Sequence, residues 1–391
     1  MSSGWRLHPT VLLMASAHMM VDGYGNILAP LLPLLIGRLD LSLAAAGTLT
    51  MLYQLSASVA QVGFGHLADR WRPRVLVMAG PVVSVLVLSF IGVSTTVWML
   101  AAILVLGGLG GAAFHPPAAT LAHQLGGTRP GLAMSVYISG GTLGFALGPL
   151  MFAPFAEHFG MKWTPLLALP GLVVIGLFLA RVPAVEWSSH GRGGLSALRP
   201  YAKPLGLLYA IVVLRTMTAI AFATFLPVML TRRGMSVSAA GAVVAAYLFA
   251  GGLGGFLGGP AADRWGPKQV IAWSLIASSP FLFAAPLLDG WPFFITLAIG
   301  GFFLQSTLPV NVVFGQALAP VSAGTVSSLM MGFAWGTGGM TVPLTGFIAD
   351  RIGIESTLLV LSAIPLAAAA CVIPLPGGRL KSGDPRTTVV R

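Results

Sequence analysis

Two ten-residue stretches, GHLADRWRPR at residues 65–74 and GPAADRWGPK at residues 259–268, share an Asp-Arg-Trp core and decide the fold. They lie 194 residues apart, and the same shift aligns further residues on both sides of them. The aligned pairs include Pro33 with Pro227, Tyr53 with Tyr247, Gly107 with Gly301, and Pro149 with Pro343. One constant offset over so much of the chain indicates an internal duplication.

The segments around these two stretches are apolar. Of the 391 residues, 56% are hydrophobic and only 8% are charged, whereas a soluble domain carries about 25% charged residues. A helix crosses the hydrocarbon core with about 20 apolar residues, so the runs predict an all-α membrane protein with twelve transmembrane helices. Their expected bounds are 9–36, 44–67, 74–95, 97–124, 131–157, 163–182, 204–231, 238–262, 268–288, 291–317, 323–349 and 354–375.

Twelve helices and a duplication predict two parallel six-helix repeats. We expect an N-terminal bundle over 1–182, a cytoplasmic linker over 183–203, a C-terminal bundle over 204–376 and a cytoplasmic tail over 377–391. Because six is an even number, both repeats enter the membrane from the same side. Parallel repeats of this kind occur in transporters whose halves rock around a central site.

The basic residues predict the orientation. With both termini in the cytoplasm, 15 of the 21 lysines and arginines fall in cytoplasmic segments and 5 on the other side, while Arg215 lies inside a helix. Cytoplasmic loops carry such an excess of positive charge. The net charge of +11 is therefore spread over short connections, and no basic face predicts nucleic-acid binding.

Several other classes of protein are also disfavoured. The single cysteine, Cys371, excludes an internal disulfide framework or a thiolate metal cluster. No nucleophile–base pair, metal-ligand cluster or phosphate loop appears at a spacing that predicts an enzyme. We therefore expect neither a metal nor a cofactor. The expected partners are the lipid bilayer, protons and a small-molecule substrate.

The repeated stretch resembles the cytoplasmic G-x-x-x-D-R-x-G-x-[RK] signature of the major facilitator superfamily, with Arg72 in place of the glycine in the first copy. The resemblance implies the major facilitator fold and a conformational latch at the membrane boundary. The latch residues would be Gly65, Asp69, Arg70, Arg74, Gly259, Asp263 and Arg264. The alternative is that they serve only as cytoplasmic anchors, and neither interpretation makes them substrate ligands.

A glycine-rich motif lies in the helix expected over 131–157. It consists of Gly140, Gly141, Gly144, Gly148 and Pro149. Glycines spaced by four line one helix face and allow a neighbouring backbone to approach closely. The motif resembles the glycine-proline motif of antiporters in the superfamily, which implies exchange transport. Close packing alone is the alternative explanation.

Two charged residues lie well inside apolar runs. Asp22 has His18 one turn before it and Asn26 one turn after it, on the same helix face. Arg215 lies at nearly the same depth in the second repeat, because the 194-residue shift places Asp22 on its neighbour Thr216. Since a charge at this depth costs at least about 2.5–3.5 kcal/mol, both are functional candidates. Asp22, together with His18 or His115, would exchange protons, and Arg215 would either pair with Asp22 or bind an anionic group. A purely structural ion pair between Asp22 and Arg215 is the alternative.

Three more polar residues lie in the helices expected over 97–124 and 291–317. They are His115, Gln305 and Asn311. Histidine titrates near neutrality, so His115 is a candidate proton or substrate ligand, the alternative being a structural core histidine. In the superfamily, the four helices that carry these residues and the two buried charges line the central cavity. The resemblance therefore implies a substrate site formed by Arg215, Asn26, His115, Gln305 and Asn311.

Three stretches narrow the resemblance: AHMMVD at 17–22, AFHP at 113–116 and GLAMS at 131–135. They resemble the fosmidomycin-resistance group of bacterial efflux proteins, although Pro117 stands where that group has a glutamate and Arg215 where a lysine is expected. The group implies a monomeric bacterial inner-membrane antiporter that exports small, often anionic molecules in exchange for protons. A proton-linked importer of an organic anion such as a carboxylate, and a non-transporting membrane sensor or scaffold, remain alternatives.

Overall fold

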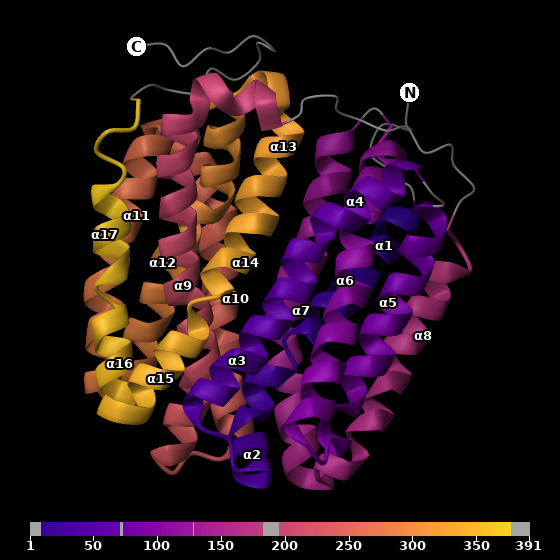
Figure 1. Ribbon diagram of the computed structural model, residues 1–391, viewed down its shortest axis with the longest axis vertical. Helices are drawn as coiled ribbons and strands as arrows, with labels where there is room; N and C mark the ends of the chain where they lie inside the picture. Colours follow the sequence, from indigo (N-terminus) through magenta and orange to yellow (C-terminus); the bar gives the residue numbers. More distant parts are fainter. Residues whose placement is uncertain (1–8, 71–72, 128, 183–194, 377–391) are drawn as a thin grey trace. The chain divides into compact units, whose positions relative to one another are not determined.

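The computed structural model describes residues 9–70, 73–127, 129–182 and 195–376, which are almost entirely helical (Figure 1). These described residues contain no β-strand. Ten of their helical stretches are long and apolar enough to cross a membrane, and a shorter apolar helix covers Ile354–Ala370. The prediction of an all-α membrane protein is therefore confirmed.

The helices follow the predicted order. The first repeat contains α1 (Pro9–Gly25), α2 (Leu28–Leu39), α3 (Leu43–Gln54), α4 (Ala60–Arg70), α5 (Pro73–Ser89), α6 (Val97–Leu125), α7 (Pro130–Phe159) and α8 (Ala168–Leu179). The second contains α9 (Ala202–Arg232), α10 (Val237–Trp265), α11 (Pro267–Ala284), α12 (Gly290–Leu318), α13 (Ala323–Ser327), α14 (Ala334–Gly339), α15 (Val342–Ile352), α16 (Ile354–Leu361) and α17 (Ile364–Ala370). π-helical turns at Leu55–Val59 and Ser328–Phe333 connect α3 to α4 and α13 to α14.

Short turns interrupt three of the predicted helices. The segment expected over 9–36 divides into α1 and α2, the one over 323–349 into α13, α14 and α15, and the one over 354–375 into α16 and α17. Pro30, Pro343 and Pro365 each lie in the first turn of the helix after a break. Proline has no N–H and its ring clashes with the carbonyl four residues earlier, which favours ending the preceding helix there.

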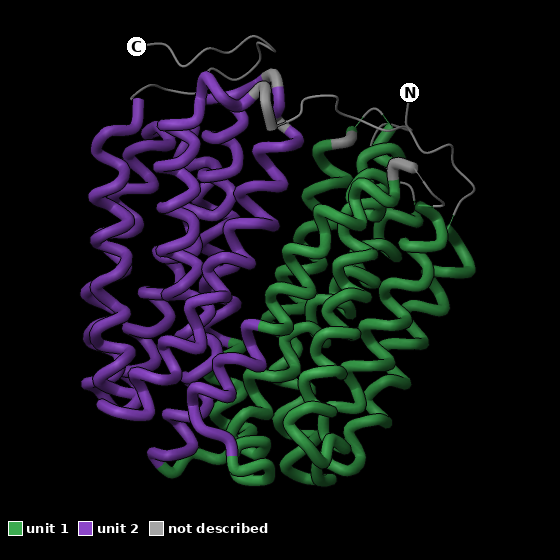
Figure 2. Tube along the Cα trace, in the orientation of Figure 1, with its two compact units in different colours: residues 1–40, 52–189, 234–245 green, residues 41–51, 190–233, 246–391 purple. Residues whose placement is uncertain are grey.

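The chain divides into two compact units (Figure 2). Unit 1 comprises residues 1–40, 52–189 and 234–245, and unit 2 comprises residues 41–51, 190–233 and 246–391. Each unit thus combines most of one predicted bundle with a short helix start from the other sequence repeat. Residues 183–194 of the expected linker and the whole expected tail lie outside the described residues, so the predicted domain limits stay a prediction.

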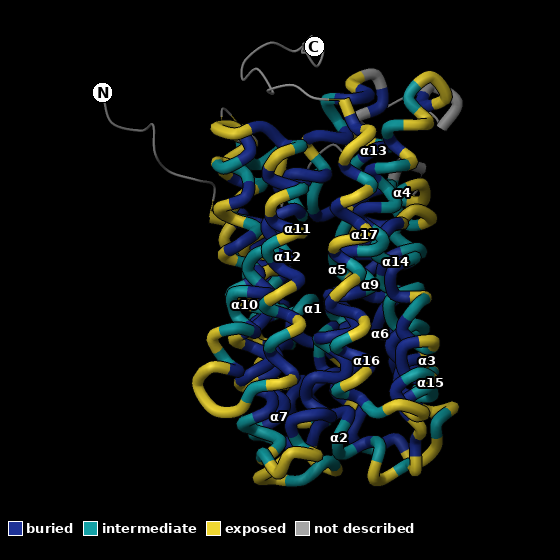
Figure 3. Tube along the Cα trace, turned by 90° about the vertical axis from the view of Figure 1, so that its left-hand side faces the viewer, coloured by how far each residue is buried: buried dark blue, intermediate teal, exposed yellow. Residues whose placement is uncertain are grey.

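The outer face of α8 shows why these helices suit a bilayer. Leu169, Val173 and Leu177 recur every four residues and are exposed, while Ile175 and Phe178 on the other side are buried. Figure 3 shows the same combination of buried and exposed residues along other helices. Apolar side chains on an exposed stripe of a long helix are those that lipid would cover.

Candidate functional site

The glycine motif of α7 packs against α1. A Cβ atom on Gly140, Gly144 or Gly148 would collide with backbone atoms of α1. Only glycine therefore permits this distance between the two backbones, which agrees with the predicted close packing. The antiporter role that the motif implies stays a prediction.

Gly141 makes room for the charged side chains of α1. A Cβ atom at this position would lie 2.6 Å from His18 Nε2 and would also press on the carboxylate of Asp22. The motif thus does more than bring two backbones together. It leaves the space in which a histidine and an aspartate of α1 lie against the backbone of α7.

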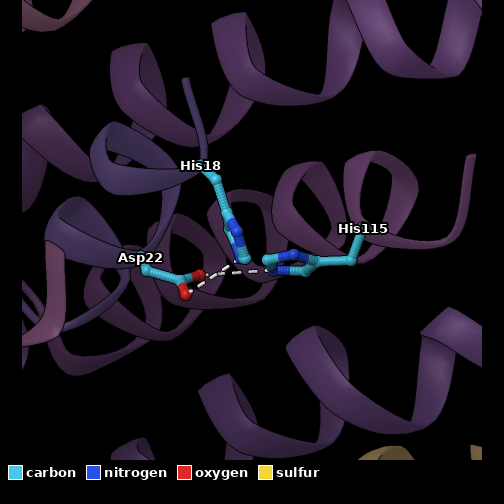
Figure 4. A group of neighbouring side chains, drawn as sticks. All are labelled: His18, Asp22 and His115. Carbon is cyan, nitrogen blue, oxygen red and sulfur yellow. Dashed lines mark ion pairs between the residues drawn. The ribbon is translucent and has the colours of Figure 1, made fainter. Parts of the chain in front are cut away.

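Asp22 lies between two histidines in unit 1 (Figure 4). Its Oδ2 atom is 3.2 Å from His18 Nε2, and its Oδ1 atom is 3.4 Å from His115 Nε2. The side chain of Asp22 is only 12% exposed, and those of His18 and His115 are 10% and 22% exposed. The structure therefore brings together the three residues that the sequence predicts for proton coupling, two from α1 and one from α6.

The orientation of His18 is fixed by α7. Its Nδ1 atom lies 2.8 Å from the backbone carbonyl oxygen of Tyr137, and its ring stacks on the Tyr137 ring with centroids 4.2 Å apart. Because a carbonyl oxygen only accepts, the hydrogen of a neutral His18 belongs on Nδ1. Nε2 would then present a lone pair to the lone pairs of a carboxylate. This contact is favourable only if a proton lies between His18 and Asp22, on one or the other.

Apolar and aromatic side chains enclose this cluster. Phe114, Tyr137 and Phe178 are buried in the same core cluster of unit 1 as Met14 and Val21. In such surroundings, charges interact more strongly than in water, and the charge state of the cluster depends on how many protons it holds. The candidate ligand atoms of the three residues also lie within 4.8 Å of one another, a spacing that a metal ion could span. A shared proton satisfies the same atoms without a metal.

Arg215 is fully buried in α9, within unit 2. Its guanidinium donates hydrogen bonds to Gln305 Oε1 and, over 3.0 Å, to Thr216 Oγ1. It also lies 5.3 Å from the ring centroid of Trp335 in α14, a cation–π distance. Within the described part of unit 2, no carboxylate forms an ion pair with it, and its Nε atom has no hydrogen-bond partner. The positive charge is thus solvated by neutral groups.

The predicted polar residues Asn311 and Asn26 differ in their surroundings. Asn311 in α12 is 1% exposed, and neither atom of its amide has a partner among the described residues. Asn26 lies in the turn between α1 and α2, where its amide donates to the carbonyl of Phe145 over 3.0 Å. Helix α1 ends at Gly25, and the N–H of Asn26 still donates to the carbonyl of Asp22, one turn earlier, over 3.1 Å. The substrate role of both asparagines stays a prediction.

The alternative in which Asp22 pairs with Arg215 stays open. Asp22 belongs to unit 1 and has its partners there, whereas Arg215 belongs to unit 2 and has its own partners. Each of the two charged residues therefore has hydrogen-bond or ion-pair partners within its own unit.

The latch residues are placed only in part. A Cβ atom on Gly65 would lie 3.7 Å from Pro116, and Arg74 donates to the carbonyl of Val182 over 3.4 Å. Asp263 and Arg264 are exposed. A Cβ atom on Gly259 would meet open space, and the side chains of Asp69 and Arg70 lie outside those described. The latch role stays a prediction.

Sequence reasoning missed two residues of these environments. Tyr137 orients His18 through its carbonyl and its ring, and Trp335 faces the guanidinium of Arg215. A backbone carbonyl leaves no trace in a sequence. Trp335 is one of nine tryptophans, and its position before Gly336 gives no sign of a partner 120 residues earlier.

Comparison with known proteins agrees with this architecture. A family model described as Major Facilitator Superfamily matches residues 14–232 and 207–388. The chain is 29% identical to the fosmidomycin resistance protein of Escherichia coli (strain K12), over 93% of this chain and 92% of that protein. It is 27% identical to the probable nitrate/nitrite transporter NarK2 of Mycobacterium tuberculosis, over 88% and 90% of the two chains.

A solved structure shares the fold. The bacterial homologue of the human lysosomal transporter Spinster, in an inward-facing and unoccupied conformation, superposes with a TM-score of 0.76 at 18% identity, covering 93% of this chain and 95% of that one. These matches point to a transporter and not to an enzyme. Since the family model covers nearly the whole of both sequence repeats, the chain belongs to the major facilitator superfamily of membrane transporters.

Proposed function

We propose that this transporter exports a small anionic organic molecule in exchange for protons, by alternating access. The observation that carries the proposal is Asp22 held between His18 and His115, with the Nδ1 atom of His18 committed to a carbonyl. This arrangement requires a proton between His18 and Asp22, and a transporter that must load and release a proton needs such a group.

The proton steps follow from the donors and acceptors. With one proton shared by His18 and Asp22, the pair has no net charge, and a neutral His115 can donate its own N–H to the carboxylate. Loss of the shared proton leaves a negative charge in apolar surroundings, facing the lone pair of His18. That state is unstable until a new proton arrives or the site opens to water. Release of the proton is thereby linked to the opening of the site to water.

Arg215 supports an anionic substrate. Arg215 has no carboxylate partner among the described residues of unit 2. A buried guanidinium in this situation carries a desolvation cost that neutral neighbours offset only in part. A bound carboxylate or similar oxyanion would supply the missing charge and accept from the free Nε–H. Gln305 and Thr216 already hold the other two nitrogens of the guanidinium in a fixed orientation.

The direction of transport rests on the relatives and on the glycine motif. A relative whose name records resistance to fosmidomycin favours export. The alternative is proton-linked import of a small anion, favoured by the likeness to a probable nitrate/nitrite transporter and by the buried Arg215. In either case, the positive-charge bias of the loops supports an orientation with both termini in the cytoplasm of a bacterium and the chain in its inner membrane. A monomer would suffice.

Growth inhibition of an efflux-deficient bacterium tests the proposal. Cells would express the wild type, Asp22→Asn, Arg215→Ala or the control Asp289→Asn, whose side chain is 93% exposed, at matched membrane levels. We expect the wild type and the control to protect against at least one acidic compound, fosmidomycin being the first to try, and both site variants to lose protection. Equal protection by all four would refute the mechanism, and sensitisation of the cells by the wild type would favour import.

A further inference from the structure

The carboxylate of Asp350 in α15 caps the start of α3. Its Oδ1 and Oδ2 atoms accept hydrogen bonds from the backbone N–H groups of Leu43 and Ala44, both over 2.9 Å. These are the first two residues of α3, and all of these residues belong to unit 2. The N–H groups of a first helical turn have no partner within the helix and carry partial positive charge, so a carboxylate satisfies both needs.

The carboxylate of Glu157 in α7 caps the start of α10 in the same way. Its Oε1 atom accepts from the backbone N–H of Val237 over 3.1 Å, and its Oε2 atom from that of Ser238 over 2.9 Å. The hydroxyl of Ser238 donates to Oε2 as well. Here too the two N–H groups belong to the first two residues of the helix, and all of the residues belong to unit 1.

A serine before each helix completes the cap. Ser42 Oγ accepts from the N–H of Ala45, and Ser236 Oγ from that of Ala239, each over 3.1 Å. The serines are related by the 194-residue shift of the duplication. In both helices, a local serine therefore satisfies the third N–H, and a carboxylate from a distant helix satisfies the first two.

Glycines bring each capped helix against the helix that caps it. A Cβ atom on Gly47 of α3 would lie 2.5 Å from the carbonyl oxygen of Val342 in α15. The related Gly241 of α10 would place its Cβ atom 2.6 Å from that of Ala153 and 3.0 Å from the carbonyl oxygen of Pro149, both in α7. In each unit, two helices thus pack closely against each other, and the cap carboxylate lies at the end of this helix–helix contact.

Each contact joins a helix of one sequence repeat to a helix of the other. Rocking of the repeats against each other must therefore break both contacts, at the ends of the helices that the loop charges predict to be extracytoplasmic. Asp350 and Glu157 are exposed, so water can replace the hydrogen bonds at low cost when the contacts open. A contact that must break and re-form in each transport cycle needs hydrogen bonds that water can replace in this way.

We propose that Glu157 and Asp350, the two cap carboxylates, form a matched pair of positioning residues that hold the transporter closed at this end and release together in each transport cycle. The inference rests on the alternating-access part of the proposed function. It does not depend on which molecule is carried, or on protons.

Thiol labelling can test the proposal directly. In a Cys371→Ser background, Ala46→Cys in α3 and Ala240→Cys in α10 place probes at two repeat-related positions that are both 0% exposed. Right-side-out membrane vesicles would be treated with a membrane-impermeant maleimide. We expect Glu157→Gln and Asp350→Asn each to increase the labelling rate at both probes by about three- to tenfold, since each amide replaces an acceptor by a donor and removes the charge.

The controls separate release from damage. Asp289→Asn should leave labelling unchanged, Ser238→Ala should give a smaller increase, and Glu157→Asp, which keeps the charge, should restore slow labelling. Melting temperatures of the purified variants identify any that are misfolded, and Ser238→Ala then carries the test. A faster labelling rate only at the probe beside the altered carboxylate would refute the claim that the two contacts release together. An unchanged labelling rate at both probes would refute the claim that these carboxylates hold this end of the transporter closed. Faster labelling at both probes in the cap variants, together with a wild type that protects cells against no acidic compound, would count against the proposed function alone.

Discussion

Replacing Gly141 by alanine tests how the glycine motif serves the charged cluster. The added Cβ atom would lie 2.6 Å from His18 Nε2, so that the histidine must retreat by at least about 0.8 Å to reach 3.4 Å, the start of ordinary van der Waals contact. Overpacking of this size costs about 1–3 kcal/mol of stability. A displacement near 1 Å in a reacting group can cost about a hundredfold in rate. We therefore expect Gly141→Ala to fold but to transport at about one-hundredth of the wild-type rate.

The matched control is Gly176→Ala on α8. A Cβ atom there meets nothing within 4 Å, and alanine in a helix is more stable than glycine by about 0.5–1 kcal/mol. Melting temperature in detergent and initial transport rate in proteoliposomes would be measured for both variants. The reasoning is refuted if Gly141→Ala transports as fast as Gly176→Ala.

Two further predictions concern the environments of His18 and Arg215. Tyr137→Phe should keep both stability and transport, because the ring and the backbone carbonyl remain and the buried hydroxyl has no partner among the described residues. Tyr137→Ala, by contrast, should lose about 3–5 kcal/mol of stability. Equal melting temperatures of the two variants would exclude a role for the stacked ring. Arg215→Met should abolish saturable transport of an anionic substrate while leaving the melting temperature equal or higher, since it removes a buried charge that has no acidic partner among the described residues of unit 2. A variant that unfolds instead would show that the charge is structural.

Local patterns in the sequence predicted much of the fold. The apolar runs located the helices to within a few residues, because the bilayer imposes a length and an apolar composition on each span. The three interruptions were not predicted, although Pro30, Pro343 and Pro365 lie next to them. Proline is also found inside unbroken helices here, Pro116 and Pro117 of α6 among them, so its presence alone does not locate a break.

The site was predictable where it depends on helix periodicity. His18 and Asp22 are four residues apart, and a helix places them on one face. His115 is a candidate because histidine titrates near neutrality and because its stretch resembles a known family, and the structure brings it to the same carboxylate. Contacts with backbone atoms, such as that of His18 with Tyr137, carry no sequence signal.

The cap carboxylates show a different limit. In the sequence, Glu157 lies near the end of an expected helix, which predicts only an interfacial residue, and no motif distinguishes Asp350. The two lie 193 residues apart, one residue short of the shift that relates the serines and helix starts they serve. A comparison at a single offset therefore aligns Glu157 with Arg351 and hides the equivalence, which appears only when the hydrogen bonds are seen.

The central claim is that Asp22 carries the coupling proton. The most direct test is transport by purified protein in proteoliposomes, with the compound that the growth assay identifies, in two modes: movement driven by a pH gradient, and exchange of labelled for unlabelled substrate without a gradient. We predict that Asp22→Asn abolishes the driven mode and retains the exchange mode, because the amide can still accept and donate hydrogen bonds but cannot release a proton. Driven transport at the wild-type rate by Asp22→Asn would contradict the account.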